Sequence, residues 1–256
     1  MQIHRMKTMR LFLLAAVVFS IPLAGEAATF SLNPGADAFV TTGPTANLSG
    51  NNYGAAGAVA VAAPGSAQGE FQSVLQFNLA GAKTSFDSQF GAGAWTIQSV
   101  TLQLTAVPPN NAIFNASAAG QFGLSWMQND GWTEGTGTPQ APTTTGVTFS
   151  TLNNFISGAD ESLGTFSYNG ATSGNNSYSL NLTPGFSGEV LSGSTVSLRM
   201  FAADNAVSYL SDSRNFPTTT ARPLLTVSVV PEPGVSGLLF LGACVAGARF
   251  IRRRGK

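Results

Sequence analysis

Apolar residues recur at every second position in six stretches of this chain, and this period strongly restricts the folds that the chain can adopt. Successive side chains of a β-strand point to opposite faces, whereas an amphipathic helix repeats its apolar positions at a longer spacing. The pattern therefore predicts strands that each bury one face. The six stretches are 71–79, 99–107, 121–128, 176–182, 194–202 and 223–230.

Turn-forming sequences separate these strands, and no long segment keeps a helical period. Residues such as Gly, Asn, Ser and Pro favour tight turns, and they gather in the connections. At most, 83–90 and 151–161 could each form a short helix. Many short strands without long helices are typical of antiparallel sandwiches. We therefore predict an all-β fold, a single antiparallel β-sandwich of jelly-roll-like form, over residues 28–229.

The first 27 residues have the layout of a secretory signal peptide. Arg5, Lys7 and Arg10 form a basic start, an apolar run covers 11–24, and small residues follow. This order of basic, apolar and small residues is typical of a cleaved export signal. We predict an N-terminal signal helix with cleavage after Ala27. The alternative is a retained membrane anchor, for which the run is short.

The last 27 residues, 230–256, also have three parts: Pro231-Glu232-Pro233, an uncharged run over 235–248, and a basic cluster. The run is shorter than the ~20 residues of a standard transmembrane helix, so we predict a short membrane helix. The positive-inside rule places the cluster in the cytoplasm and the preceding domain outside. The cluster comprises Arg252, Arg253, Arg254 and Lys256.

This three-part tail resembles the PEP-CTERM sorting signal of Gram-negative bacteria. The resemblance implies that an exosortase-type membrane protease recognises and removes the tail. The protein would then pass from the inner membrane, where the tail holds it transiently, to the cell surface or extracellular matrix. It also implies a link to exopolysaccharide or biofilm. An ordinary C-terminal anchor is the alternative.

The predicted sandwich has a different charge balance from the whole chain, whose formal net charge is zero. Residues 28–230 contain four basic and ten acidic residues, which gives a net charge of −6. An acidic domain lacks the basic surface that binds nucleic acid, so we expect no such partner.

His4 and Cys244 are the only histidine and cysteine of the chain, and both lie outside the predicted sandwich. The sandwich therefore has no Ser-His-Asp triad, no Cys nucleophile, no usual zinc ligand set and no disulfide. Asp130 and Glu134 could be read as a glycosidase pair, but closeness in sequence does not place two carboxyls across a bond. We predict a protein that is not an enzyme.

Four stretches, in order, resemble the DNRLRE domain, a family of bacterial surface β-sandwiches. One carries Leu75, Phe77 and Leu79 in the family's apolar strand, and another carries Ser213-Arg214. Asn215 stands where the family usually has an acidic residue. The resemblance implies a sandwich, and some relatives are carbohydrate-binding modules for uronic-acid polymers. The stretches are 37–61, 69–81, 129–139 and 209–229.

The densest polar and aromatic cluster is 129–135. Trp132 could stack on a sugar ring while Asp130 and Glu134 bind hydroxyls; alternatively, Trp132 closes the core and Glu134 pairs with an Arg. Arg214 and Arg222 have planar guanidinium groups that suit carboxylates, either of an acidic polysaccharide or of the protein itself. We expect Trp132 to close the core and the charged groups to find their partners within the protein.

Calcium is the one cofactor that the residues leave open. Asp37, Asn52 and Asp212 lie in or beside predicted loops and carry oxygen ligands. No EF-hand spacing is present, so these are weak candidates. The resulting expectation is a non-enzymatic surface or matrix protein; the alternative is a carbohydrate-binding module for an acidic polysaccharide.

Overall fold

The computed structural model describes residues 26–45, 47–109, 111 and 113–232. The predicted signal helix, the predicted membrane helix and the basic cluster lie outside these residues. Within the described ranges, no helix combines the length and the apolar character that crossing a membrane requires.

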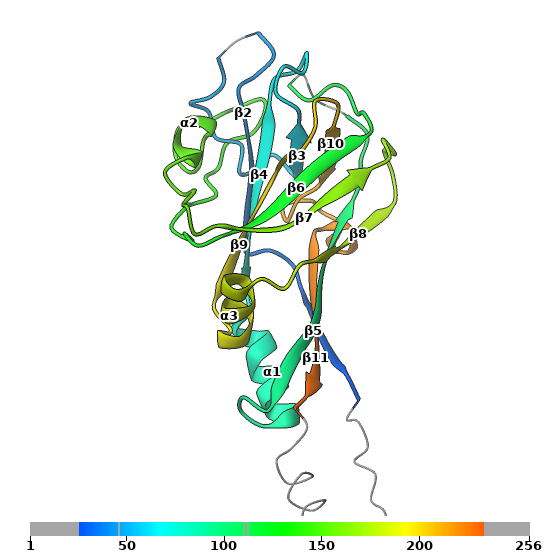
Figure 1. Cartoon of the computed structure of the whole chain (residues 1–256). Helices are drawn as coiled ribbons and strands as arrows, with labels where there is room; N and C mark the ends of the chain where they lie inside the picture. The colour runs from blue at the N-terminus through cyan, green and yellow to red at the C-terminus, as the bar shows by residue number, and fades with distance from the viewer. Residues whose placement is uncertain (1–25, 46, 110, 112, 233–256) are drawn as a thin grey trace, which may run out of the picture. The chain divides into compact units, whose positions relative to one another are not determined.

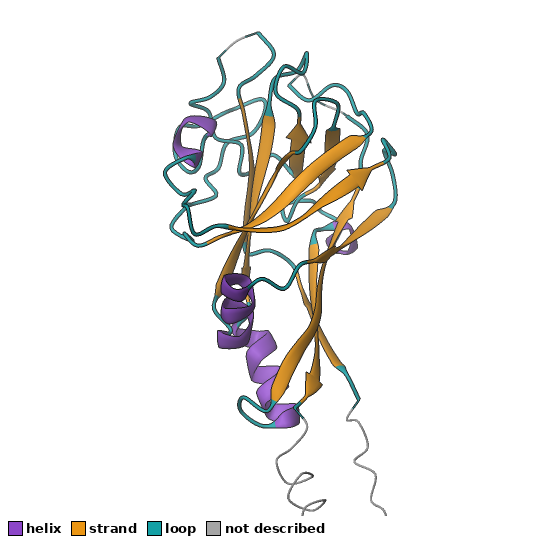
Figure 2. Ribbon diagram, in the orientation of Figure 1, coloured by secondary structure: helices purple, strands orange, loops and turns teal. Residues whose placement is uncertain are grey.

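The domain is mostly β, with 41% strand against 13% helix, and its strands form two antiparallel sheets (Figures 1 and 2). This confirms the β-rich fold that the alternation predicts. One sheet has the order β1 (Ala28–Leu32), β11 (Leu224–Pro231), β5 (Trp95–Thr105), β8 (Asn175–Leu180). The other has the order β10 (Ser208–Asp212), β3 (Ala58–Ala62), β4 (Phe71–Asn78), β9 (Thr195–Ala202), β6 (Gly120–Met127), β7 (Glu161–Tyr168), and β2 (Ala36–Thr41) also pairs with β4.

The main core lies between the two sheets and takes side chains from both. Phe77 of β4 and Phe122 of β6 are fully buried against Leu102 of β5 and Val227 of β11. These residues occupy the apolar positions of the period-two pattern. Burial of such side chains contributes about 1.5–3 kcal/mol each to folding, so this shared face holds the sheets together.

The pattern is wrong about the second face of β4. Gln72 and Val74, which lie on this face, are also buried, at 8% and 0% exposure. A separate cluster covers this face, in which Val74 packs with Met127 and Trp132. Chain segments that follow β6 supply part of this cover, and their arrival cannot be read from the strand's own sequence.

The helical predictions need correction. The predicted helix at 83–90 falls within α1 (Ala80–Phe90). Of the second predicted helix, 151–161, only the first two residues are helical, and they form the end of α2 (Phe149–Leu152). We did not expect α3 (Pro184–Ser192), which buries Phe186 and Val190 one helical turn apart. A short 3₁₀ turn, η1, covers Thr219–Ala221.

The strand predicted at 176–182 ends earlier than expected. β8 stops at Leu180, and Leu182 is 41% exposed instead of lying in the core. The chain leaves the sheet here because the Asn181 N–H donates to the Leu163 carbonyl of the other sheet, at 2.9 Å.

Candidate functional site

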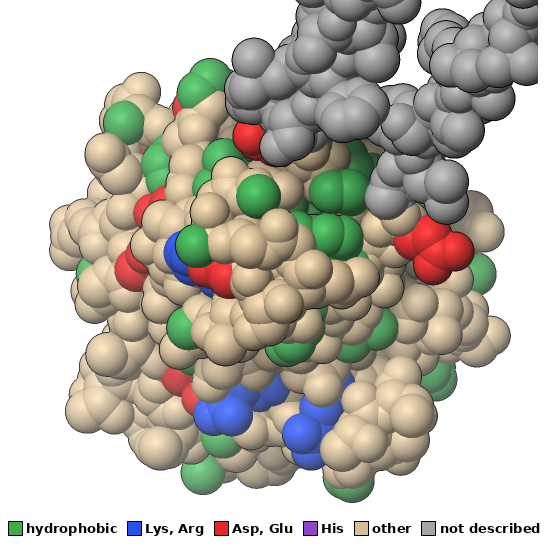
Figure 3. Space-filling view, turned by 90° about the horizontal axis from the view of Figure 1, so that it is seen from below, with side chains coloured by type: hydrophobic (Ala, Val, Ile, Leu, Met, Phe, Trp, Pro, Cys, Tyr) green, Lys and Arg blue, Asp and Glu red, His purple; other side chains and the backbone are tan. Residues whose placement is uncertain are grey.

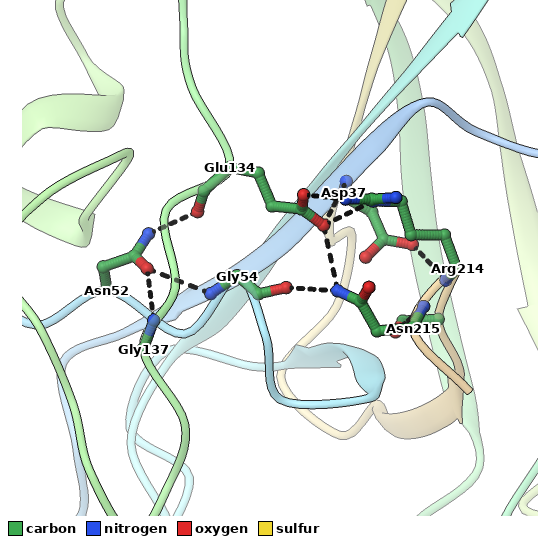
Figure 4. Close-up of polar contacts among 8 residues, drawn as sticks. Asp37, Asn52, Gly54, Glu134, Gly137, Arg214 and Asn215 are labelled. Carbon is green, nitrogen blue, oxygen red and sulfur yellow. Dashed lines mark hydrogen bonds and ion pairs between the residues drawn. The ribbon is translucent and has the colours of Figure 1, made fainter. Parts of the chain in front are cut away.

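Polar residues from three distant segments meet beside β2 (Figure 4). The Arg214 guanidinium forms a bidentate ion pair with the Glu134 carboxylate: Nε donates to Oε1 at 2.6 Å, and Nη2 donates to Oε2. A planar guanidinium matches a carboxylate in this two-bonded arrangement, which fixes both side chains. The internal pairing that we expected for Glu134 is therefore present.

Asn215 closes the same contact from the other side. Its Nδ2 donates to Glu134 Oε1 at 3.0 Å and to the Gly54 carbonyl at 2.9 Å. An acidic side chain at this position would turn a negative group toward Glu134 and could not donate. The amide is thus the residue type that this contact requires, and the sequence signal for it was an Asn where the DNRLRE pattern that this stretch resembles usually has an acidic residue.

Asp37 is the most enclosed charged group of the cluster, at 0% exposure. Its Oδ2 accepts a hydrogen bond from the Arg214 backbone N–H at 2.7 Å, whereas Oδ1 has no hydrogen-bond partner among the described residues. Burial raises the pKa of Asp37 to about 7, and the nearby Glu134 carboxylate adds to the rise while Arg214 opposes it. The Asp37 carboxyl is therefore partly protonated near neutral pH.

The Asn52 side chain links neighbouring loops by hydrogen bonds. Its Nδ2 donates to the carbonyls of Glu134 and Val147 at 2.7 and 2.8 Å, and its Oδ1 accepts from the N–H groups of Gly54 and Gly137, both at 3.1 Å. A Cβ at Gly137 would overlap the Asn52 carbonyl, so only glycine permits this approach. The Nδ2 and Oδ1 atoms of Asn52 are therefore both used in hydrogen bonds within the protein.

The three calcium candidates differ in their surroundings. The Asn52 amide oxygen accepts from two backbone N–H groups, and Asp37 Oδ2 accepts from the Arg214 N–H. Burial raises the pKa of Asp212 to about 6, which reduces its negative charge near neutrality. Across the described ranges, no group of three or more His, Cys, Asp or Glu residues could hold a metal ion.

Trp132 is buried, at 4% exposure, and belongs to the core cluster on the outer face of β4. Its Nε1 donates to Ser197 Oγ at 2.9 Å. Trp126 and Tyr53, the other rings of a conceivable sugar platform, are 5% and 2% exposed. None of these rings offers a face on which a sugar could stack, so Trp132 closes the core as we expected.

Asp130 and Arg222 do not join the Glu134 cluster. Asp130 has a buried Oδ1 without a hydrogen-bond partner in the described chain, and burial raises its pKa although bonds from Ser197 oppose the rise. The Arg222 Nε donates to the Phe216 carbonyl at 2.9 Å, which keeps it within its own loop. Of the five candidate ligand residues, the structure therefore brings together Glu134 and Arg214, whereas Trp132, Asp130 and Arg222 lie outside this pair.

The sorting motif is described only at its start. Pro231 ends β11 opposite Trp95, and the Glu232 N–H donates to the Ala94 carbonyl at 2.9 Å. Pro233 and the Arg252–Arg254 cluster lie outside the described residues.

No family model and no curated protein matches the chain. The function is therefore argued from the sequence patterns and from the contacts above.

Proposed function

We propose that this is a non-enzymatic, exported protein of the cell surface or extracellular matrix of a Gram-negative bacterium. Its sandwich, DNRLRE-like in sequence, is delivered by the signal peptide and by the PEP-CTERM-like tail, on which an exosortase-type protease acts. The support comes from the order of basic, apolar and motif residues at both ends of the chain. Exopolysaccharide is the expected surrounding of the mature domain.

The observation that carries this proposal is the pairing of β1 with β11. Ala28 lies opposite Val229, so the first and last strands end side by side at one end of their sheet. A signal peptide before β1 and a sorting tail after β11 would both extend from this end. The loops at the opposite end would then face away from the membrane during sorting.

The contacts of the polar residues are consistent with a structural role. Glu134, Arg214, Asn215 and Asn52 bind one another and the backbone of neighbouring loops, and Trp132 is enclosed. The alternative function, a carbohydrate-binding module for an acidic polysaccharide, would need a surface other than the Trp132 ring. The surface or matrix role is therefore our first choice.

The test is the intact mass of the protein recovered from a Gram-negative host with an exosortase-type system. We expect a product that has lost the first 27 residues and the chain beyond the Pro231-Glu232-Pro233 region. Replacing Glu232 with Ala should retain the tail in the membrane fraction. Pro108→Ala, in an exposed loop, is the matched control and should be processed normally. A surface product that still carries Arg252 to Lys256 would overturn the proposal.

A further inference from the structure

A pocket of about 450 Å³ lies between α1, α3 and the first half of β5. Leu182 and Leu191 line it, and within the described chain they are the two exposed large hydrophobic side chains, at 41% and 42% exposure. Trp95 and Ile97 of β5 supply the opposite wall. Figure 3, seen from the end of the domain with α1, shows hydrophobic side chains near the middle of the surface, with acidic and basic side chains around them. Clustered exposed apolar groups of this kind mark binding surfaces.

The first half of β5 is also an open sheet edge. β11 pairs with β5 from Trp95 to Gln103, but β8 pairs only with Val100 to Thr105. The chain turns away after Leu180, so no described strand covers residues 95–99 on that side. Thr96 and Gln98 are exposed here. An uncovered edge presents backbone N–H and C=O groups that another strand can use.

We propose that this pocket binds an extended peptide segment with a large aliphatic side chain and a neighbouring basic residue, and that the peptide adds as a strand to the open edge of β5. The peptide backbone would pair with residues 95–99, while its aliphatic side chain would enter between Leu182 and Leu191. This is the mode in which main-chain hydrogen bonds supply affinity and a side-chain pocket supplies specificity. The pocket volume lies within the usual range of roughly 300–1,000 Å³ for ligand sites.

The charges around the pocket select the basic residue. Asp87 is already occupied, because it accepts hydrogen bonds from Lys83 Nζ and, at 2.8 Å, from Trp95 Nε1. Glu232 is exposed at the rim and has no side-chain hydrogen bond within the described chain. Its carboxylate is the group that a Lys or Arg of the peptide would approach.

A second copy of this chain fits the site less well than a basic peptide. The net charge of −6 over residues 28–230 makes two copies repel each other. A peptide from a basic partner gains from the same charge. We therefore assign the site to a basic partner segment.

Peptide binding does not depend on tail sorting, so the two proposals fail separately. The probe is the acetylated and amidated hexapeptide Lys-Thr-Val-Leu-Val-Lys, titrated into the purified full-length chain by calorimetry. A second peptide has the same sequence with N-methyl groups on alternate residues. It keeps the side chains and loses N–H donors along one edge. We expect saturable binding of the first and about tenfold weaker binding, or none, of the second.

Two substitutions test the pocket itself. Leu191→Glu should weaken binding about tenfold, because it places a charge in the apolar wall. Thr165→Glu, at an exposed position of β7 in the other sheet, is the control and should leave binding unchanged. Glu232→Gln should weaken binding and reduce its dependence on salt. Melting curves check that each variant folds.

The proposal is overturned by any of four results. The first is no binding of the unmodified hexapeptide. The second is equal binding of the N-methylated peptide, which would mean that strand addition plays no part. The third is unchanged binding to a folded Leu191→Glu variant. Self-association that Leu191→Glu abolishes, without peptide binding, would identify a second copy as the occupant and would also overturn it.

Discussion

Trp132 has Gly131 and polar residues as sequence neighbours, yet its ring is enclosed between β4 and the segments that follow β6. Large-to-small substitution of a buried ring removes apolar contacts and leaves a cavity. We expect Trp132→Ala to lower the free energy of unfolding by about 3–5 kcal/mol. Trp132→Phe keeps most of the packing and loses the bond to Ser197, so it should cost less. Urea denaturation measures both.

A binding assay on acidic polysaccharides belongs beside that measurement. We expect neither substitution to change binding in any variant that remains folded. An alanine variant with unchanged stability and lost polysaccharide binding would mean that the ring is a ligand platform.

Asp37 makes the stability of the domain depend on pH. Its pKa is about 7 in the folded protein against 3.8 usually, because burial disfavours the charged form. Between these values the folded state holds a proton that the unfolded state has released. The free energy of unfolding should therefore fall as pH rises from about 4 to about 7. Asp212, whose pKa is raised to about 6, acts in the same direction.

The measurement is urea unfolding at several pH values for wild type and Asp37→Asn. Asparagine is neutral at every pH and its amide oxygen can still accept from the Arg214 N–H. We expect the variant to lose much of the fall between pH 4 and pH 7. Equal slopes for both proteins would show that Asp37 does not titrate in this range.

At the scale of elements, α3 forms from a sequence with few of the usual helix signals. Pro184 at the start matches the fixed φ of a first helical residue, and Gly193 ends the helix in the left-handed region at φ 70°. In between, Phe186 and Val190 bury one face. Packing of that face, more than propensity, stabilises the helix.

Alanine at Gly188, within α3, and at Gly193, directly after it, should change the free energy of unfolding in opposite directions. Gly188 is exposed in the helix with open space around it, so Gly188→Ala should stabilise the protein by about 0.5–1 kcal/mol. Gly193 has positive φ, and a Cβ there would come 2.7 Å from the Lys83 Cβ, so Gly193→Ala should destabilise by about 1 kcal/mol or more. Thermal melts decide, and a stable Gly193→Ala protein would contradict the left-handed end.

For the whole molecule, the pairing of β1 with β11, the first and last strands of the described residues, is the feature on which the proposed sorting arrangement rests. Ser31 of β1 lies opposite Thr226 of β11, and their hydroxyl oxygens are 2.8 Å apart although 195 residues separate them in sequence. Almost the whole domain therefore lies between these two contacting residues in sequence. A covalent link at this point would restrict the unfolded chain over that length.

We expect the double variant Ser31→Cys/Thr226→Cys, in a Cys244→Ser background, to form a disulfide on oxidation. Closing so long a loop should raise the free energy of unfolding by about 2–5 kcal/mol. Ser31→Cys/Ser228→Cys is the matched control, because Ser228 lies opposite Thr29 and the pair is out of register. Melting with and without reductant measures the effect, and efficient cross-linking of the control alone would mean a different strand register.

The sequence by itself determined six of the eleven strands described, β4, β5, β6, β8, β9 and β11, and the side of each that faces the main core. Alternation is a local consequence of strand geometry, so Phe77, Leu102 and Phe122 could be assigned to the core without any partner in view. Counting residues also sufficed for the acidic charge of the sandwich and for its lack of histidine and cysteine.

Only the tertiary structure decided the second buried face of β4, the exposure of Leu182 and the partner of Glu134. Arg214 is 80 residues from Glu134, and its guanidinium arrives only because β2 and the end of β10 are brought together. The same holds for Trp132, whose burial depends on Val74 of another segment. A residue's type states what it can bind, but which atoms surround it depends on contacts between segments far apart in the chain, and these exist only once the sheets have paired.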